Sequence, residues 1–158
     1  TPTIVKALWS NTSGEGWGLY AEQLAAEAGM YRDDPFGDLG RLQAELHRAV
    51  RLVTDTGMHA KQWSREQAIE YMVTTEGLDE STATSEIERY VVWPAQALGY
   101  KLGQLNILAL RQEAKAALGE RFDLRDFNQQ VLNVASAPMP FIQLTIRNWI
   151  TVTSADTE

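Results

Sequence analysis

A short glycine-rich stretch of the sequence carries a carboxylate that could do chemistry. Glu15 lies between Gly14 and Gly16, and Gly18 directly follows Trp17. Glycine costs about 0.5–1 kcal/mol relative to alanine inside a helix, so its repeated use predicts that another backbone or a ligand comes close. Alternatively, Thr12 to Glu15 fits a capping box, in which the glutamate bonds back to the helix N-terminus. The residues alone leave both interpretations open.

A second set of chemically capable residues recurs at four-residue steps: His47, Arg51, Asp55 and His59. In an α-helix this spacing stacks the side chains on one face. They could form a functional row. They could equally form a solvated face, whose local ion pairs contribute only about a few tenths of a kcal/mol each.

A third pair, Tyr100 and Gln104, lies one helical turn apart in a helix that is apolar on its other side. This spacing would let both side chains hydrogen-bond one ligand. The alternative is an ordinary surface face.

Composition limits the classes of function. The chain has 158 residues, of which 44% are hydrophobic, enough for one domain with a core or for a piece of a larger one. The formal net charge of -7 makes nucleic acid and anionic membranes poor candidate partners. No apolar run approaches the roughly 20 residues needed to span a bilayer. The absence of cysteine excludes disulfides and thiolate chemistry and leaves the compartment open, cytoplasmic or exported.

Helical periodicity predicts an all-α fold of about six to seven helices, in a single domain covering residues 1–158. The expected helices are 15–29, 36–57, 64–77, 81–93, 94–118, 123–134 and 141–152. Ser64 with Gln67 fits a capping box, Gly77 a C-terminal stop and Asp123 an N-cap. The apolar run at 4–9 could be the end of a further helix.

Three apolar stripes predict which helix faces turn towards the core. The first comprises Leu39, Leu42, Leu46, Val50 and Val53. The second comprises Leu98, Leu102, Leu105, Ala109 and Ala116. The third comprises Ile142, Ile146, Trp149 and Ile150.

Four separated pieces of the sequence resemble, in the right order, the bacterial domain-of-unknown-function family 885. They are 15–22 (EGWGLYAE), 51–59 (RLVTDTGMH), 63–64 (WS) and 93–104 (WPAQALGYKLGQ). Proteins of this family are helical and resemble gluzincin-type zinc metallopeptidases. The resemblance extends over nearly the whole chain and concerns the C-terminal portion of the family.

The resemblance implies a zinc site that this chain would hold only in part. In such proteins a His-Glu…His motif supplies two histidine ligands and the general base, and a glutamate matched by Glu15 is the third ligand. Three protein ligands leave a position for water, whose pKa the metal lowers towards about 7. The chain has no His-Glu…His motif. We therefore expect a fragment or an inactive remnant that binds no zinc by itself.

The same pieces suggest hypotheses for the other residues. Tyr100 or His59 would donate a hydrogen bond to the oxyanion formed when water attacks the peptide substrate. Arg51 would orient a substrate carboxylate through a bidentate contact, with Asp55 holding the arginine in place. Gln104 would contact the substrate beside the tyrosine.

Two functions remain open. In the C-terminal part of a zinc peptidase, Glu15, His59 and Tyr100 would converge on one cleft, and a large exposed apolar surface would favour a homodimer. In a helical protein-interaction module, the glutamate would merely cap its helix, and Arg51 would pair with Asp55 on the surface.

A metal site built from His47, His59 and Glu15 alone is disfavoured. The two histidines, twelve residues apart on one helix, would lie about 18 Å from each other.

Overall fold

The structure is a computed structural model that describes residues 10–155. This part of the chain is all-helical, with seven α-helices and no strand, which confirms the predicted fold class. The expected helix end at 4–9 lies outside the described residues. Between residues 10 and 155, no helix has the length and apolarity needed to cross a membrane.

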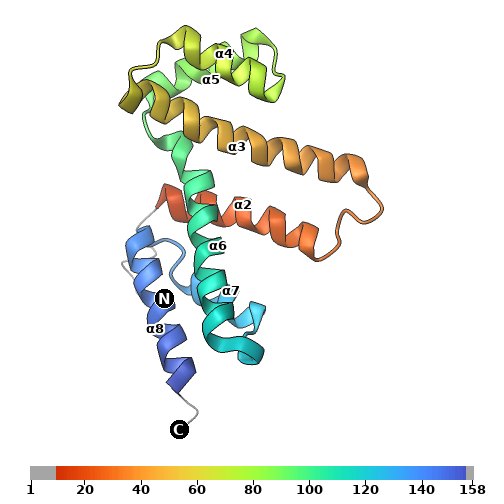
Figure 1. The fold of residues 1–158 in the computed structure, drawn as a ribbon, viewed down its shortest axis with the longest axis vertical. Helices are drawn as coiled ribbons and strands as arrows, with labels where there is room; N and C mark the ends of the chain where they lie inside the picture. Colours follow the sequence, from red (N-terminus) through yellow and green to blue (C-terminus); the bar gives the residue numbers. More distant parts are fainter. Residues whose placement is uncertain (1–9, 156–158) are drawn as a thin grey trace. The chain divides into compact units, whose positions relative to one another are not determined.

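Each predicted helix is present, with bounds that differ from the predicted ones by up to five residues (Figure 1). The α-helices are α2 (Asn11–Glu27), α3 (Pro35–Lys61), α4 (Arg65–Glu76), α5 (Glu80–Val92), α6 (Gly99–Leu118), α7 (Leu124–Asn133) and α8 (Met139–Ala155). Two short 3-10 helices are η1 (Gln96–Leu98) and η2 (Gly119–Arg121). Ser64 and Gln67 form the reciprocal capping box of α4, which Gly77 ends in a left-handed conformation. Asp123 caps α7 as predicted.

The chain folds as two compact units. Among the described residues, the first combines 10–20 with 102–155, and the second comprises 21–101. Helices α2 and α6 contribute residues to both units.

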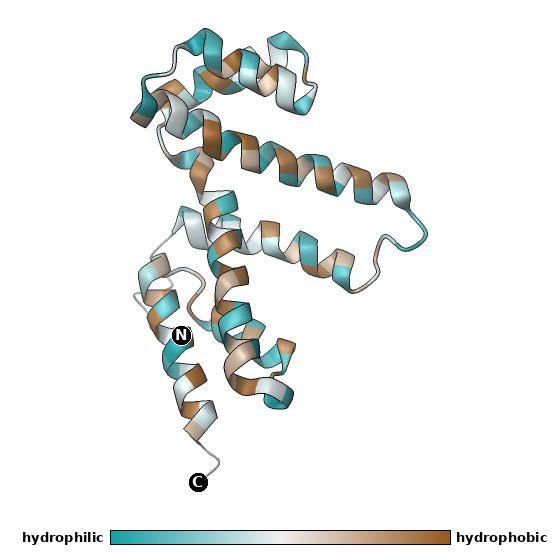
Figure 2. Ribbon diagram, viewed as in Figure 1, coloured by the Kyte–Doolittle hydropathy of each residue, from teal (hydrophilic) through white to brown (hydrophobic). Residues whose placement is uncertain are grey.

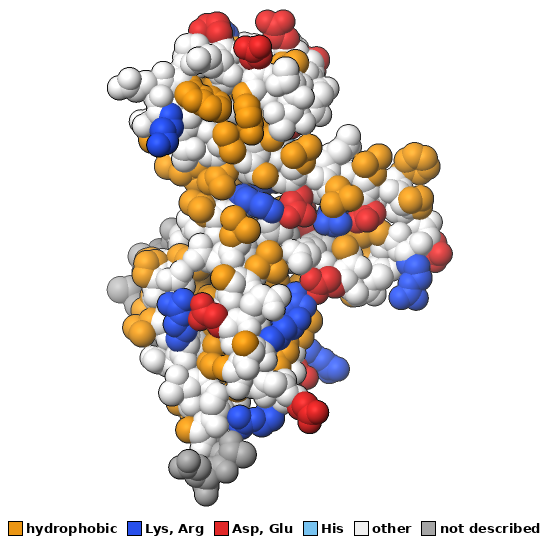
Figure 3. Space-filling model, in the orientation of Figure 1, with side chains coloured by type: hydrophobic (Ala, Val, Ile, Leu, Met, Phe, Trp, Pro, Cys, Tyr) orange, Lys and Arg blue, Asp and Glu red, His pale blue; other side chains and the backbone are white. Residues whose placement is uncertain are grey.

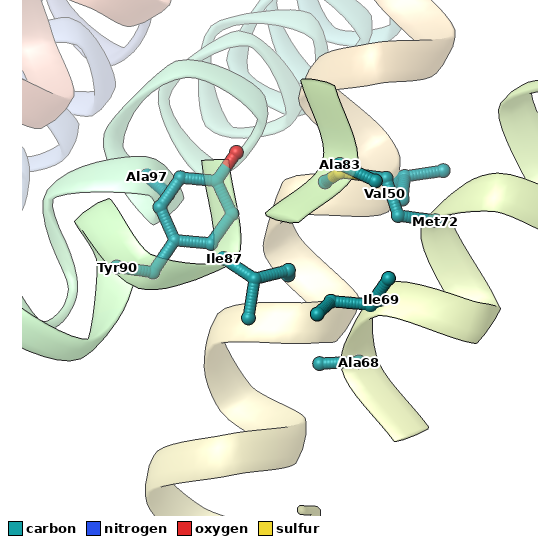
Figure 4. Packing of buried hydrophobic residues seen from close by; sticks show 8 residues of the cluster. All are labelled: Val50, Ala68, Ile69, Met72, Ala83, Ile87, Tyr90 and Ala97. Atoms are coloured by element: carbon teal, nitrogen blue, oxygen red, sulfur yellow. The ribbon is translucent and has the colours of Figure 1, made fainter. Parts of the chain in front are cut away.

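The core of the second unit lies among α3, α4, α5 and η1 (Figure 4). Its buried side chains are Val50, Ala68, Ile69, Met72, Ala83, Ile87, Tyr90 and Ala97. At the end of α3, Trp63 packs on Gly57, where an added Cβ would lie 2.6 Å from the indole ring. Two of the sequence pieces quoted above therefore meet in this unit.

The predicted core stripe of α3 is wrong. Only Val50 of that stripe is buried. The other members are 37% to 52% exposed: Leu39, Leu42, Leu46 and Val53. Figure 2 shows brown, hydrophobic segments recurring along α3.

The part of α3 that packs against α4, α5 and η1 is its C-terminal half, in which all of its buried residues lie. It carries Thr54, which is completely buried, and Gly57, whose lack of a side chain admits the Trp63 ring. It also carries Arg51 and Asp55, which are only 5% and 2% exposed. A solvated face is therefore excluded for these two members of the polar row.

The first unit packs the beginning of α2 with α6, α7 and α8. Its core comprises Leu19, Tyr20, Ile107, Leu110, Ala114, Leu118, Phe127, Val131, Met139, Ile142, Ile146 and Ile150. Ser13 donates a hydrogen bond to the carbonyl oxygen of Ala137 at 2.6 Å, and the Tyr20 hydroxyl donates to Asn128 at 3.0 Å. These bonds join residues more than a hundred positions apart.

The predicted core face of α6 is also wrong, whereas that of α8 is confirmed. Leu102 and Leu105 are 38% and 46% exposed. Gln104 and Arg111, on the side expected to be an ordinary surface, are buried together with Ile107. Burial on α6 follows the side that meets the other helices of its unit, and the leucine stripe lies on the other side.

Candidate functional site

Glu15 lies about one turn inside α2, which begins at Asn11. The capping-box interpretation is therefore wrong, because it requires the helix to start after Thr12. Within residues 10–155, the Glu15 carboxylate makes no hydrogen bond and no ion pair, and the side chain is partly exposed. It is a carboxylate with no structural partner in this part of the chain.

A direct contact between α2 and α6 fixes the backbone beside Glu15. A Cβ added to Gly16 would lie 2.6 Å from the carbonyl carbon of Gly103, and a Cβ on Gly103 would lie 2.6 Å from Gly16 Cα. The approach of another backbone, one of the two predicted explanations for the glycines, therefore accounts for Gly16. Gly18 has open space around it.

Arg51 is the centre of the polar row on α3. Its Nη2 donates a hydrogen bond to Oε1 of Gln96 at 3.1 Å. Its guanidinium carbon lies 5.4 Å from the ring centroid of Tyr90 and 4.8 Å from that of Tyr100. Sequence reasoning missed Arg48, one turn before Arg51, whose guanidinium carbon lies 5.6 Å from the Tyr100 ring. The available signal was its three-residue spacing from Arg51.

Asp55 does not pair with Arg51. Both of its carboxylate oxygens accept a hydrogen bond from the backbone N–H of Ala95, at 3.0 and 3.2 Å. Ala95 has a φ of 66°, a left-handed conformation that is uncommon for a residue with a side chain. Asp55 thus stabilises the turn that leads to Gln96 and then to Tyr100. The surface pair expected for an interaction module is not formed.

Both histidines have partners within the second unit. Nε2 of His59 donates to the carbonyl oxygen of Tyr90 at 3.1 Å. Nδ1 of His47 lies 2.8 Å from a carboxylate oxygen of Glu76, and its Nε2 lies 3.7 Å from Glu86. Over residues 10–155, no three His, Asp or Glu side chains are grouped so that they could hold a metal ion.

Tyr100 is partly buried at the start of α6, and its hydroxyl has no hydrogen-bond partner in the described part of the chain. The second unit therefore brings Tyr100, Arg51 and Asp55 to the connection between α5 and α6, with His59 bonded to the end of α5. Glu15 and Gln104 belong to the first unit. Convergence of Glu15 with His59 and Tyr100 stays a prediction.

Comparison with known proteins gives one family. Residues 1–146 match the family model described as "Bacterial protein of unknown function (DUF885)". No curated protein matches the chain.

Two solved structures are similar to the chain. One is described as a lipoprotein of Colwellia psychrerythraea; it has 58% identity and a TM-score of 0.84, over 90% of this chain and 24% of that protein. The other is described as a lipoprotein of unknown function from Shewanella oneidensis, with 27% identity and a TM-score of 0.80, over 86% of this chain and 25% of that protein. The chain thus spans about a quarter of the length of these structures.

Proposed function

Because the chain belongs to the DUF885 family of bacterial proteins, we propose that it is the C-terminal part of a zinc-dependent peptidase. The observation that carries the proposal is the Glu15 carboxylate, which has no partner among residues 10–155 and lies beside a fixed helix contact. A partly exposed carboxylate that makes no other hydrogen bond or ion pair is a suitable ligand for zinc. The description of both solved relatives as lipoproteins favours an exported protein.

Zinc would be held by Glu15 together with two histidines from a part of the polypeptide beyond this chain. When bound, zinc would supply a water acidic enough to act as a nucleophile near neutral pH. The general base would come from the same external segment. Alone, the chain provides one ligand and no base, so we expect neither tight zinc binding nor hydrolysis from it.

Of the two predicted oxyanion donors, Tyr100 is the one with an unused donor hydrogen, which can serve a substrate oxyanion or a substrate carboxylate but not both at once. Its hydroxyl is uncommitted within the described residues, whereas the Nε2 hydrogen of His59 is already donated to Tyr90. Neutral histidine has only one N–H, so His59 could donate to substrate only after losing this bond or gaining a proton. Asp55 acts by positioning, through the Ala95 turn that precedes Tyr100.

The test is a calorimetric zinc titration of a full-length polypeptide that contains this sequence. We expect one tight site, weakened by about 100-fold or more in the Glu15→Gln variant, since even outer-shell substitutions cost 10–100-fold. The matched control is Glu120→Gln, at an exposed position in η2. Unchanged affinity in Glu15→Gln would remove this residue as a ligand. Absence of zinc binding by the wild type would remove the peptidase proposal.

A second candidate function is association with another copy of the chain through the apolar face of α3. This candidate is supported by the exposure of apolar side chains along the first half of the helix, namely Phe36, Leu39, Leu42 and Leu46. Figure 3 shows hydrophobic side chains gathered on the surface formed by α3. An apolar face of this kind is typical of a surface that another protein segment covers.

A further inference from the structure

In the second unit, arginine and tyrosine side chains contact one another in an alternating series that runs from the exposed Arg89 to the partly buried Arg48. The guanidinium carbons of Arg89 and Arg51 each lie 5.4 Å from the ring centroid of Tyr90. Arg51 also contacts the ring of Tyr100, which Arg48 approaches in turn. Contacts of this kind attract a guanidinium to an aromatic ring but leave its positive charge uncompensated. The stack therefore concentrates three cations that need negative partners.

One end of this stack holds a carboxylate. Glu86 accepts a hydrogen bond from the Tyr90 hydroxyl at 2.6 Å, and the same oxygen accepts from Nη2 of Arg89. An arginine and a tyrosine thus hold one carboxylate between them. Arg89 and Tyr90 thus show that an arginine beside a tyrosine can bind an anion in this fold.

The other end has the same donors, and in the described part of the chain no carboxylate lies within ion-pair distance of them. Within residues 10–155, neither Arg48 nor Arg51 forms an ion pair. Arg48 donates through Nη1 to the carbonyl oxygen of Ala44 at 2.9 Å, and the Nε atoms of both arginines are buried without a hydrogen-bond partner. The Tyr100 hydroxyl is likewise uncommitted in this part of the structure.

Neighbouring cations of the same unit are neutralised. Arg41 and Lys101 both pair with Glu45, at 3.3 and 2.7 Å. Arg48 and Arg51, by contrast, have no carboxylate within ion-pair distance in the described part of the chain, and only the more distant charges of Asp55 and Glu86 act on Arg51. Two cations one turn apart repel each other, and each buried N–H without an acceptor costs free energy. An anionic partner would remove both costs.

We propose that Arg48, Arg51 and the Tyr100 hydroxyl bind the free C-terminal carboxylate of a peptide. The two oxygens of a carboxylate match the planar donor fork of a guanidinium. A singly charged ligand also suits a chain with a net charge of -7, which repels polyanions. The peptide nature of the ligand rests on the proposed function, and it defines the substrate class as peptides cleaved near their C-terminal end.

The test is a metal-free NMR titration of this chain with N-acetyl-dialanine and with its C-terminal amide. We expect the acid to shift the Nε–H signals of Arg48 and Arg51 and to bind at least about tenfold more tightly than the amide, because hydrogen bonds to a charged group are the stronger ones. Arg48→Gln should lower affinity for the acid by about tenfold and remove the preference over the amide. Arg65→Gln, at an exposed arginine paired with Glu88, is the matched control and should change neither.

Tyr100→Phe provides a second variant that keeps the aromatic ring and removes only the hydroxyl. It should weaken binding of the acid while leaving that of the amide unchanged. If Arg48→Gln fails to fold, this variant and the wild-type comparison of acid with amide still decide the question.

Three results would overturn the proposal. The first is an acid that binds no better than the amide. The second is acetate binding as tightly as the dipeptide acid, which would identify a site for small anions. The third is equal binding of N-acetylglutamate diamide, which would identify a site for side-chain carboxylates. None of these measurements involves zinc or hydrolysis, so failure of the peptidase proposal would be seen separately.

Discussion

Asp55 illustrates how the fold uses a buried charge for positioning. Its carboxylate is almost completely buried and accepts only the backbone N–H of Ala95. Burial raises the pKa of Asp55 above its usual value, and the hydrogen bond from Ala95 with the nearby His59 and Arg51 opposes this only in part. The folded chain therefore binds a proton at this carboxylate more readily than the unfolded chain does.

This raised pKa predicts a pH-dependent stability. A folded-state pKa above the unfolded value contributes stability that is fully present below about pH 3.9 and is lost as pH rises through the folded pKa. Asp55→Asn keeps an oxygen acceptor for Ala95 and cannot ionise. The free energy of unfolding of Asp55→Asn relative to wild type should therefore increase between about pH 4 and pH 7, measured by urea unfolding at each pH.

Asp33→Asn, at an exposed position in the loop before α3, is the control and should give a difference that does not depend on pH. A difference for Asp55→Asn that falls as pH rises would contradict the assignment. It would mean that the ionised carboxylate is favoured by folding.

At the scale of the helices, the contact between α2 and α6 depends on two glycines. Gly16→Ala would place a methyl group within 2.6 Å of the Gly103 carbonyl carbon, on a rigid backbone that cannot yield cheaply. We expect a loss of about 1–3 kcal/mol in the free energy of unfolding, as for other overpacked sites. Thermal and urea unfolding measure it.

Gly18→Ala is the matched control two residues along the same helix. An added Cβ meets nothing there within 4 Å, and alanine is a better helix former by about 0.5–1 kcal/mol. This variant should therefore be more stable than wild type. Equal losses at the two positions would show that helix propensity, not the contact with Gly103, governs Gly16.

The sequence predicted where the helices begin and end better than which way they face. Ser64, Gly77 and Asp123 act through local hydrogen bonds and backbone conformation, which a few neighbouring residues determine. The buried face of a helix depends instead on what packs against it. On α3 the leucines of the predicted stripe precede residue 50, whereas burial begins at Val50, in the half of the helix where Gly57 lets the Trp63 ring approach.

The candidate site could be predicted as a set of residues but not as an arrangement. Four-residue spacing correctly indicated that Arg51 and Asp55 lie on one helix face. Their actual partners, Gln96 and the N–H of Ala95, come from a turn forty or more positions later. No local pattern could identify these partners, because the turn is held in place by the tertiary fold.

At the scale of the whole molecule, the exposed apolar side of α3 predicts self-association. Light scattering after size exclusion should give twice the 17.7 kDa mass of the chain at high concentration. The Leu42→Glu variant should remain monomeric, because a charge at the centre of an apolar interface is costly to bury. Leu144→Glu, at a similarly exposed position on α8, should leave the dimer intact. A monomer at every concentration would contradict the prediction.

The two units differ in how far apart along the sequence their contacting residues lie, and therefore in when they can fold during synthesis. The second unit is built from helices that follow one another along the sequence, so its contacts are local and close quickly. The first unit joins Ser13 to Ala137, across 124 positions. During synthesis at about 5–20 residues per second, the start of α2 leaves the ribosome roughly 6–25 s before its partners exist. The glycine-rich segment around Glu15 is therefore synthesised well before the segment near Ala137 to which it is hydrogen-bonded.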